Sequence, residues 1–176
     1  MPLKSGTGAA VESDEAIARR TNHVQSVIDR LIGLSPIYGT FLSTMTLTSV
    51  TRGTVITSLT LTPLHVNSKG GLHGAMSATI IDFTTGLAIA SWDMRETTGV
   101  SADMNISFLG SAKVGDVVET EAVAEKVGGS LAFVTVKISR VKEGGEGRSV
   151  VTLGRHTKYV QQARTAVGSG TGTPRG

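Results

Sequence analysis

The chain has 176 residues, 22 of them glycine and none of them cysteine, and its formal net charge is +3 at pH 7. A chain of this length predicts one domain with a sizeable hydrophobic core. The missing cysteine excludes disulfides, thiolate metal sites and a cysteine nucleophile, and the scattered positive residues, without interleaved aromatics, argue against a nucleic-acid groove.

Residues 1–12 are mostly small and polar, and we expect them to be flexible. They contain no apolar signal-peptide core, and the acidic residues Glu12, Asp14 and Glu15 argue against a transit peptide. The cytoplasm is therefore the expected location, and mitochondrial association stays open.

The first predicted element is an amphipathic helix over residues 14–33, because Ser13 is a suitable N-cap and apolar residues then recur at helical spacing. At Phe41 the period changes to two, which predicts strands. The turn at residues 51–54 makes them a hairpin, and we expect that hairpin to end at Pro63.

An apolar run from Leu72 to Trp92 is the next element. Serines, threonines and a glycine interrupt it, and one carboxylate, Asp82, lies near its middle. A membrane span would exclude such a residue, so we expect a buried helix in a soluble protein.

Four strands are predicted after this helix. From Val100 to Phe108 apolar residues alternate with Ser101, Asp103, Asn105 and Ser107, which is typical of a half-buried strand with one polar face. Glycine-rich turns separate three further strands over residues 117–127, 131–141 and 149–160.

This order of elements predicts an α+β fold, in which about six mainly antiparallel strands curl around the long helix. We assign residues 13–163 to this single domain. The tail over residues 164–176 is rich in Gly, Ser and Thr, and we expect it to be disordered.

The segment with the most chemical content runs from Asn67 to Ala75 and reads Asn-Ser-Lys-Gly-Gly-Leu-His-Gly-Ala. A glycine-rich loop that opens a helix leaves backbone N–H groups unpaired, and these suit an oxygen that carries negative charge. With an Asn, a His and the acid Asp82 nearby, acyl-transfer chemistry becomes a hypothesis.

The spacing of Gly74 and Asp82 bears on how such a site would be assembled. Eight residues of helix separate them by about 12 Å along the axis, so Asp82 does not easily reach a group bound at its own helix N-terminus. If both act on one substrate, the acid is most simply supplied by a second copy of the chain across a two-fold axis. The functional premise thus predicts a dimer with two shared sites.

Four segments of the sequence form a recognisable combination. They are 67–82, Gly99-Val100-Ser101-Ala102-Asp103-Met104-Asn105-Ile106-Ser107-Phe108, Leu131-Ala132-Phe133 and Gly154-Arg155-His156-Thr157-Lys158. Together they resemble the hotdog-fold acyl-CoA thioesterases, and most of all the acyl-CoA thioesterase 13 (thioesterase superfamily member 2) branch within the phenylacetate-type clade. The resemblance covers roughly residues 37–160.

The resemblance implies roles for five catalytic positions. Asn67 would hold the thioester carbonyl together with the backbone N–H of Gly74, and His73 would support that loop. Donors of this kind stabilise the charge that develops on the oxygen, by about 3 kcal/mol each in comparable sites. Asp82 of the opposite subunit would be general base or nucleophile, and Ser101 would position the water. We favour the base, because desolvation raises the basicity of a carboxylate.

Binding roles are assigned to Gly71, Asn105, Arg155 and Lys158, and the last two are candidates for contacts with coenzyme A phosphates at the surface. The family often has Gly where this chain has Ala75, a departure that bears on the shape of the acyl pocket. The resemblance further implies a homodimer that assembles into a homotetramer.

The resulting hypothesis is hydrolysis of a medium-to-long-chain or aromatic acyl-CoA in fatty acid metabolism, with no cofactor beyond the coenzyme A of the substrate. We expect no metal site, because His23, His65, His73 and His156 lack zinc-ligand spacing. Two alternatives stay open: a hydratase or dehydratase acting on an enoyl or hydroxyacyl thioester, and a non-catalytic acyl-CoA-binding module.

Taken singly, most of these residues have ordinary explanations, since loop glycines usually form turns, a histidine is usually structural and a strand serine is usually solvated. Asp82 is different, because a carboxylate within an apolar helix is costly unless it is paired or functional.

Overall fold

The computed structural model describes residues 12–142, 144–145 and 147–160. Helix α1 spans Asp14–Leu34 and begins where expected, because Ser13 Oγ accepts a hydrogen bond from the Ala16 N–H and acidic residues occupy the first turn. The helix buries Val24, Val27 and Ile28. The predicted lead-in helix is confirmed.

A short helix that was not predicted follows. Helix α2 spans Pro36–Phe41, with Ser35 as its N-cap and a proline in its first turn, a favourable arrangement for starting a helix. The strand expected from Phe41 onward is therefore wrong in its start: β1 spans Thr46–Thr51. Strand β2 spans Thr54–Thr60 and closes the predicted hairpin, and the 3₁₀ helix η1 begins at Pro63 and ends at His65.

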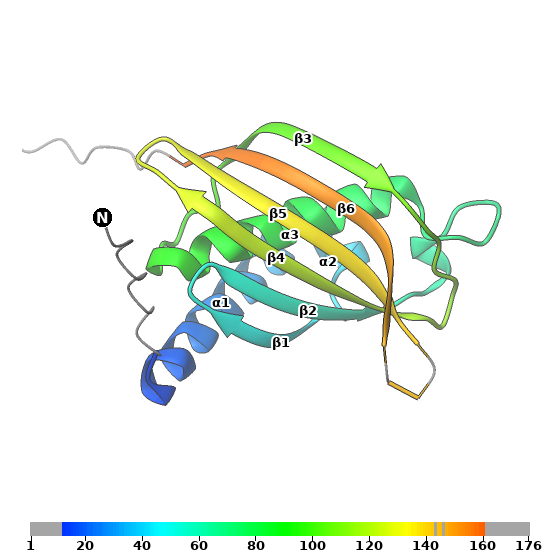
Figure 1. Ribbon diagram of the computed structural model, residues 1–176, viewed down its shortest axis with the longest axis horizontal. Coiled ribbons are helices and arrows are strands. Elements are labelled where there is room, and N and C mark those ends of the chain that lie inside the picture. Colours follow the sequence, from blue (N-terminus) through cyan, green and yellow to red (C-terminus); the bar gives the residue numbers. More distant parts are fainter. Residues whose placement is uncertain (1–11, 143, 146, 161–176) are drawn as a thin grey trace, which may run out of the picture.

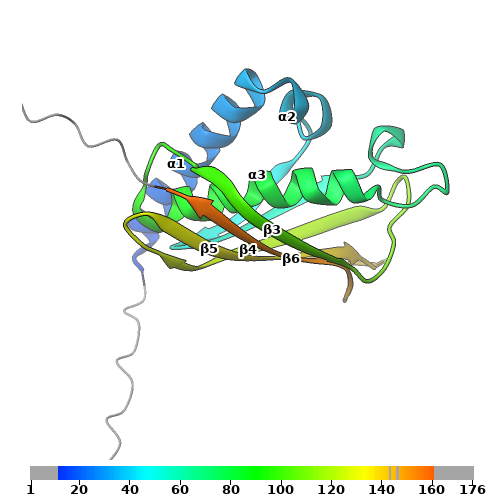
Figure 2. The same ribbon diagram turned by 90° about the horizontal axis from the view of Figure 1, so that it is seen from above.

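The long helix α3 spans Gly74–Asp93. Most of its residues from Met76 to Ser91 are buried, as the apolar run predicted, and Ile80, Ile81, Leu87 and Ile89 are fully enclosed. Figure 2 shows α3 along one side of the sheet, with α1 and α2 beyond it. No helix in the described ranges is both long and apolar enough to cross a membrane.

The remaining strands are β3 (Val100–Phe108), β4 (Val117–Val127), β5 (Leu131–Val141) and β6 (Arg148–Tyr159). All six strands form one antiparallel sheet in the order β1-β2-β4-β5-β6-β3, which curves around α3 (Figure 1). The expected α+β arrangement of a curled sheet, a central helix and an N-terminal helix is confirmed.

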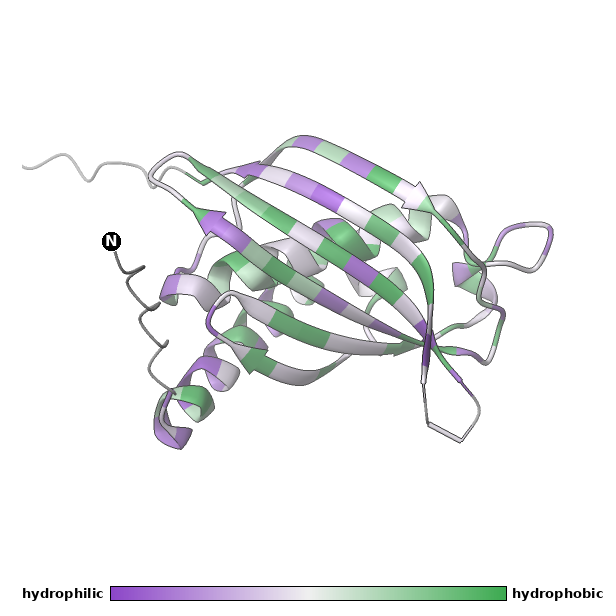
Figure 3. Cartoon of the chain, in the orientation of Figure 1, coloured by the Kyte–Doolittle hydropathy of each residue, from purple (hydrophilic) through white to green (hydrophobic). Residues whose placement is uncertain are grey.

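Hydrophobic packing between α3 and the inner face of the sheet forms the core. The alternation of apolar and polar residues that this requires is visible along the strands in Figure 3. Gly154 of β6 faces α3 so closely that a Cβ at this position would lie 2.8 Å from Ile81 Cδ1. Helix α3 and β6 are therefore in close contact at Ile81, the residue that precedes Asp82.

Strand β3 departs from the simple alternation that the sequence predicted. Ser101 pairs with Lys158 and Asp103 pairs with Thr157, so the register shifts between these two residues of β3. A bulge of this kind places one extra residue in the strand and reverses which side chains share a face. Ser101 consequently points to the inner face, whereas Asp103 and Asn105 point to the outer face.

The flexibility expected for residues 1–12 and the disorder expected for residues 164–176 fall almost entirely outside the described residues. The boundaries of the predicted domain therefore remain predictions.

Candidate active site

The carboxylate of Asp82 lies where α3, α2, β3 and β6 meet. Its Oδ1 accepts hydrogen bonds from Lys158 Nζ at 2.8 Å and from Ser101 Oγ at 3.2 Å, and its Oδ2 accepts one from the Tyr38 hydroxyl at 2.7 Å. Its side chain is 31% exposed. An acid that the sequence could place only on a helix thus has a fixed orientation and a defined set of donors.

The proton positions around Ser101 follow from the partners of its hydroxyl. Ser101 Oγ lies 3.0 Å from His156 Nε2 and also contacts Asp82 Oδ1. Because an ionised carboxylate can only accept hydrogen bonds, the hydroxyl proton of Ser101 points to Asp82. Ser101 Oγ must then accept from His156, which assigns the imidazole proton to Nε2. The result is a directed chain from His156 through Ser101 to Asp82.

The charge state of this cluster differs from the expectation. Burial is the largest influence on the pKa of Asp82 and raises it, but the hydrogen bond and charge of Lys158, with the Tyr38 bond and His156, outweigh it and lower the pKa below its usual value. The predicted gain in basicity is therefore wrong in sign. Asp82 is ionised at neutral pH and is held as an anion.

His156 is neutral at the same pH. Burial, and then the nearby charge of Lys158, lower its pKa to about 4, although Asp82 and Asp103 act in the opposite direction. A neutral imidazole with its proton on Nε2 serves as a hydrogen-bond donor to Ser101.

The loop before α3 holds Asn67 in one orientation. Its Oδ1 accepts hydrogen bonds from the backbone N–H groups of Lys69 at 2.9 Å and Gly71 at 3.3 Å. Because both neighbours are donors, the side-chain oxygen faces the loop, and the Nδ2 amide group has no acceptor within the described chain. Asn67 thus presents N–H donors, as a carbonyl-binding role requires.

The start of α3 adds a further donor beside this loop. His73 is the N-cap, and its Nδ1 accepts from the Ala75 N–H at 3.0 Å. Gly74 is the first helical residue, so its N–H has no partner within the helix. A Cβ at Gly74 would lie 3.3 Å from Phe108, and one at Gly71 would lie 2.5 Å from Ser111 Oγ, so the loop packs tightly at both glycines.

Within one chain, the structure separates the loop before α3 from the acid. Asn67, Gly70 and Gly71 line a shallow depression of about 220 Å³. Asp82 and Ser101 line a different groove of about 360 Å³, with Tyr38, Ile37 and Met104 among its other walls. The two groups that were expected to act in one reaction thus lie apart within one chain, and we refer to the loop with Asn67 and the cluster around Asp82 as the two half-sites.

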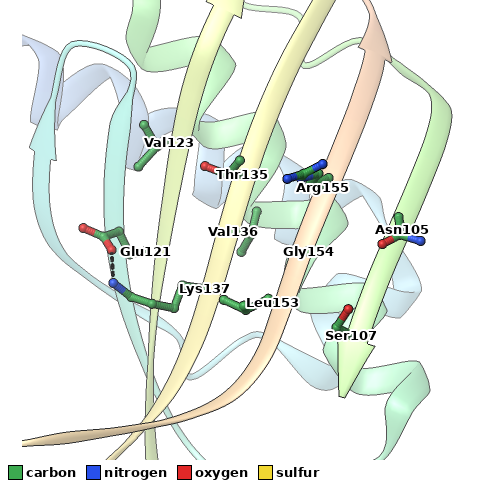
Figure 4. Close-up of a pocket in the computed structure, with 10 residues that line it drawn as sticks. All are labelled: Asn105, Ser107, Glu121, Val123, Thr135, Val136, Lys137, Leu153, Gly154 and Arg155. Atoms are coloured by element: carbon green, nitrogen blue, oxygen red, sulfur yellow. Dashed lines mark ion pairs between the residues drawn. The ribbon is translucent and has the colours of Figure 1, made fainter. Parts of the chain in front are cut away.

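Arg155 and Asn105 lie on the other face of the sheet. Arg155 of β6 pairs with Asn105 of β3. Both residues line an outer pocket of about 490 Å³, together with Thr135 and Leu153, and Figure 4 shows all four side chains. Lys158 does not accompany Arg155, because it points inward, is 4% exposed and bonds to Asp82. The expectation that both residues lie at the surface is therefore wrong for Lys158.

Tyr38, His156 and the inward position of Lys158 were not predicted as parts of the acid cluster. Period-two alternation, counted from the inward Gly154, would have placed His156 and Lys158 on the same inner face. No sequence signal indicated Tyr38, because its element, α2, was itself missed.

Comparison with known proteins adds independent information. The profile of the family described as "Thioesterase superfamily" matches residues 69–147 of this chain. That range includes His73, Gly74, Asp82 and Ser101, whereas Asn67, His156 and Lys158 lie just outside it.

Individual relatives match over a longer range. Human acyl-coenzyme A thioesterase 13 is 34% identical over 119 residues, which are 68% of this chain and 81% of the relative. The crystal structure of zebra fish thioesterase superfamily member 2 has a TM-score of 0.68 at 34% identity and covers 78% of this chain and 96% of that one. Thioesterase superfamily member 2 from Mus musculus has a TM-score of 0.67 at 30% identity, with 79% and 96% covered.

Proposed function

Because the chain belongs to the thioesterase superfamily and is a thioester hydrolase, we propose that it hydrolyses an acyl-CoA to the free acid and coenzyme A. Similarity to acyl-coenzyme A thioesterase 13 supports this substrate class. The observation that carries the proposal is the ionised Asp82 carboxylate, bonded to Ser101 and open to a groove. Water is the second substrate, and the chemistry uses side chains and backbone without a metal ion or other cofactor.

The first half-site binds the thioester carbonyl. Asn67 Nδ2 and the Gly74 N–H donate to the carbonyl oxygen, and both bonds strengthen as negative charge develops on that oxygen during attack. His73 keeps the start of α3 in place by capping it. Gly71 keeps the loop close to Ser111 and so fixes Asn67.

The second half-site prepares the nucleophile. A water molecule donates one proton to Asp82 Oδ2 and the other to Ser101 Oγ, whose own proton is already directed at Asp82. Asp82 takes the proton as the water oxygen attacks the thioester carbon, and the thiolate of coenzyme A leaves. The fixed orientation of the carboxylate compensates for its modest basicity.

The two half-sites come from different copies of the chain. Eight helical residues, about 12 Å along the axis, separate Gly74 from Asp82, and the depression beside Asn67 shares no lining residue with the groove beside Asp82. Strand β3 is an end strand with exposed apolar residues, including Val100 and Phe108, so its open edge and apolar side chains suit pairing with a second copy. The complete assembly is a homodimer with two shared sites, which pairs further into a homotetramer.

The acyl group is medium-to-long-chain or aromatic. Ile37, Ala78 and Met104 provide apolar walls beside Asp82, and burial of an apolar chain against them favours binding by about 25 cal/mol per Å². Ala75 adds a methyl group at the start of α3 and narrows that end of the site. Arg155 and Asn105 contribute to coenzyme A binding at the outer surface.

A panel of acyl-CoA substrates, assayed by release of thiol, tests this function. We expect octanoyl-, palmitoyl- and phenylacetyl-CoA to give a higher kcat/KM than acetyl-CoA. Asp82→Asn is expected to lower kcat by about a hundredfold or more, because it removes the proton acceptor. Activity close to that of the unaltered chain in this variant would contradict the assigned role.

One complication of that variant has a direct control. Asp82→Asn removes the counter-charge of Lys158, which is 4% exposed, and so costs about 3 kcal/mol of stability. The double variant Asp82→Asn with Lys158→Met removes both charges, and we expect it to regain stability without regaining turnover. Tight binding of acyl-CoA by the unaltered chain without thiol release would instead support a binding module.

A further inference from the structure

The two oxygens of Asp82 differ in their surroundings. Oδ1 accepts from both Lys158 and Ser101, which occupies both of its lone pairs. Oδ2 accepts from Tyr38 at 2.7 Å, the single donor that the described residues offer to this atom. Oδ2 therefore keeps one lone pair, and the position of Tyr38 determines which of its two lone pairs stays free.

The Tyr38 hydroxyl is placed by packing and not by its bond to Asp82 alone. Ser35 caps α2 by accepting from the Tyr38 N–H, and Pro36 fixes the first turn of that helix. The Tyr38 ring meets Phe83 of α3 edge-on, with centroids 4.9 Å apart and an interplanar angle of 64°. These contacts hold the phenol against the residue that follows Asp82 in the same helix.

We propose that Tyr38 is a positioning residue for the thioester hydrolysis put forward above, on which this inference rests, and that its hydroxyl aims the remaining lone pair of Asp82 Oδ2 into the groove. Tyr38 itself lines that groove, together with Ile37 from the same short helix. Tyr38 lies outside residues 69–147, the range that matches the superfamily profile.

The charges around Asp82 make the effect of this hydroxyl measurable. The groups that face the carboxylate are Tyr38 from α2 and Lys158 and His156 from β6, and Asp103 of β3 acts on His156. Burial, and then the bond to Asp82, raise the pKa of Tyr38, so it remains a neutral donor. Its bond is one of the influences that lower the pKa of Asp82, and loss of the hydroxyl should raise that pKa.

The test is Tyr38→Phe, which keeps the ring and its contact with Phe83 but removes the hydroxyl. We expect kcat for the best acyl-CoA to fall roughly ten- to hundredfold, as for loss of a hydrogen bond to a charged group, while KM changes less than about twofold. The acid limb of the kcat profile should move to higher pH. Loss of packing alone would not move that limb.

Thr79→Val is the matched control. Thr79 lines the same groove, but its hydroxyl donates to the Ala75 carbonyl of its own helix. This variant should leave the acid limb where it is in the unaltered chain. An acid limb that moves equally in both variants would overturn the role of Tyr38.

A titration of the Asp82 carboxyl carbon by NMR separates this inference from the proposed function. If the unaltered chain hydrolyses no acyl-CoA, the proposed function fails, and the positioning role fails with it. If the unaltered chain is active but Tyr38→Phe leaves both the acid limb and the Asp82 titration unchanged, only the inference about Tyr38 is overturned. A raised pKa of Asp82 together with reduced kcat supports both.

Discussion

His156 is the most deeply enclosed titratable side chain of the acid cluster. Its side chain is 0% exposed, and its Nδ1 has no hydrogen-bond partner in the described part of the chain. Protonation would place a charge on that unpaired nitrogen and beside Lys158, and this explains why the pKa of His156 is lowered to about 4. The residue is therefore an acid-sensitive point of the fold.

This gives a prediction for stability against pH. Between pH about 6.5 and about 4 the unfolded chain binds a proton at His156 that the folded chain does not, so stability falls as pH falls. The expected slope is about 1.4 kcal/mol per pH unit, a loss on the order of 3 kcal/mol across the window. Urea unfolding at several pH values measures it.

The control is His156→Gln, which keeps a donor for Ser101 but does not titrate. In this variant the free energy of unfolding should lack the extra dependence on pH between 6.5 and 4. The difference in the free energy of unfolding between the two proteins at pH 7.5 reports only packing. Asp82 contributes separately, since its pKa is lowered from 3.8 and its stabilisation is lost only at still lower pH. An identical slope in both proteins between pH 6.5 and 4 would contradict the assignment.

Residue types in the sequence indicated the half-sites better than they indicated side-chain direction. The glycine-rich loop over residues 67–75 and the acid Asp82 were singled out from residue types, whereas the roles of Asn67, Gly74 and Ser101 were taken from the family resemblance. Lys158 was placed at the surface as a candidate contact with coenzyme A phosphates. Its partner, Asp82, lies 76 residues away in sequence, and that pairing requires the tertiary fold.

At the level of elements, the turn between β1 and β2 packs against the end of α3. Gly53 has φ 78°, and a Cβ there would lie 2.7 Å from Trp92 Cε3. Arg52 stacks over the Trp92 ring at 5.0 Å and donates to the Trp92 carbonyl. The glycine thus meets both a backbone requirement and a steric one.

We expect Gly53→Ala to destabilise the fold by about 2–5 kcal/mol, of which about 1–2 is backbone strain and the rest overpacking. Gly115→Ala isolates the first contribution, because Gly115 has φ 89° and a Cβ there would meet no atom within 4 Å. That variant should lose only about 1–2 kcal/mol. Equal urea midpoints for the two variants would show that the Trp92 contact costs nothing.

The elements that the sequence predicted well are those with long, regular patterns. The bounds of β4 and β5 agree with the prediction to the residue, and α3 begins at Gly74, two residues into the apolar run that predicted it. Helix α2 was missed because six residues are too few to show a helical period. The bulge in β3 was missed because alternation continues unbroken through Ala102, and only pairing with β6 reveals the shift.

At the scale of the whole molecule, the sequence could predict that two chains share a site, but not how the two chains are arranged around it. The spacing along α3 follows from helix dimensions alone. How a second chain would approach depends on which faces stay exposed, and that depends on the sheet order, with β3 at one end. A test of sharing must therefore be made on assembled molecules.

Mixed dimers of two inactive variants provide that test. Asn67→Ala removes one half-site and Asp82→Asn the other, so each variant alone should be nearly inactive. In a hybrid dimer with shared sites, one site combines the intact Asn67 of one chain with the intact Asp82 of the other. Random exchange makes half of the dimers hybrid, so the mixture should regain about a quarter of the unaltered activity.

If instead each site lay within one chain, every site of the hybrid would carry a defect, and mixing would restore nothing. Mixing Asp82→Asn with Ser101→Ala is the control, because both changes affect the same half-site. If the sites are shared, one site of each hybrid then contains Asp82→Asn and the other contains Ser101→Ala. Activity should therefore stay at the level of the separate variants. Recovery in the first mixture and not in the second, after exchange verified by mass spectrometry of the intact assembly, would distinguish sharing from simple stabilisation by a partner.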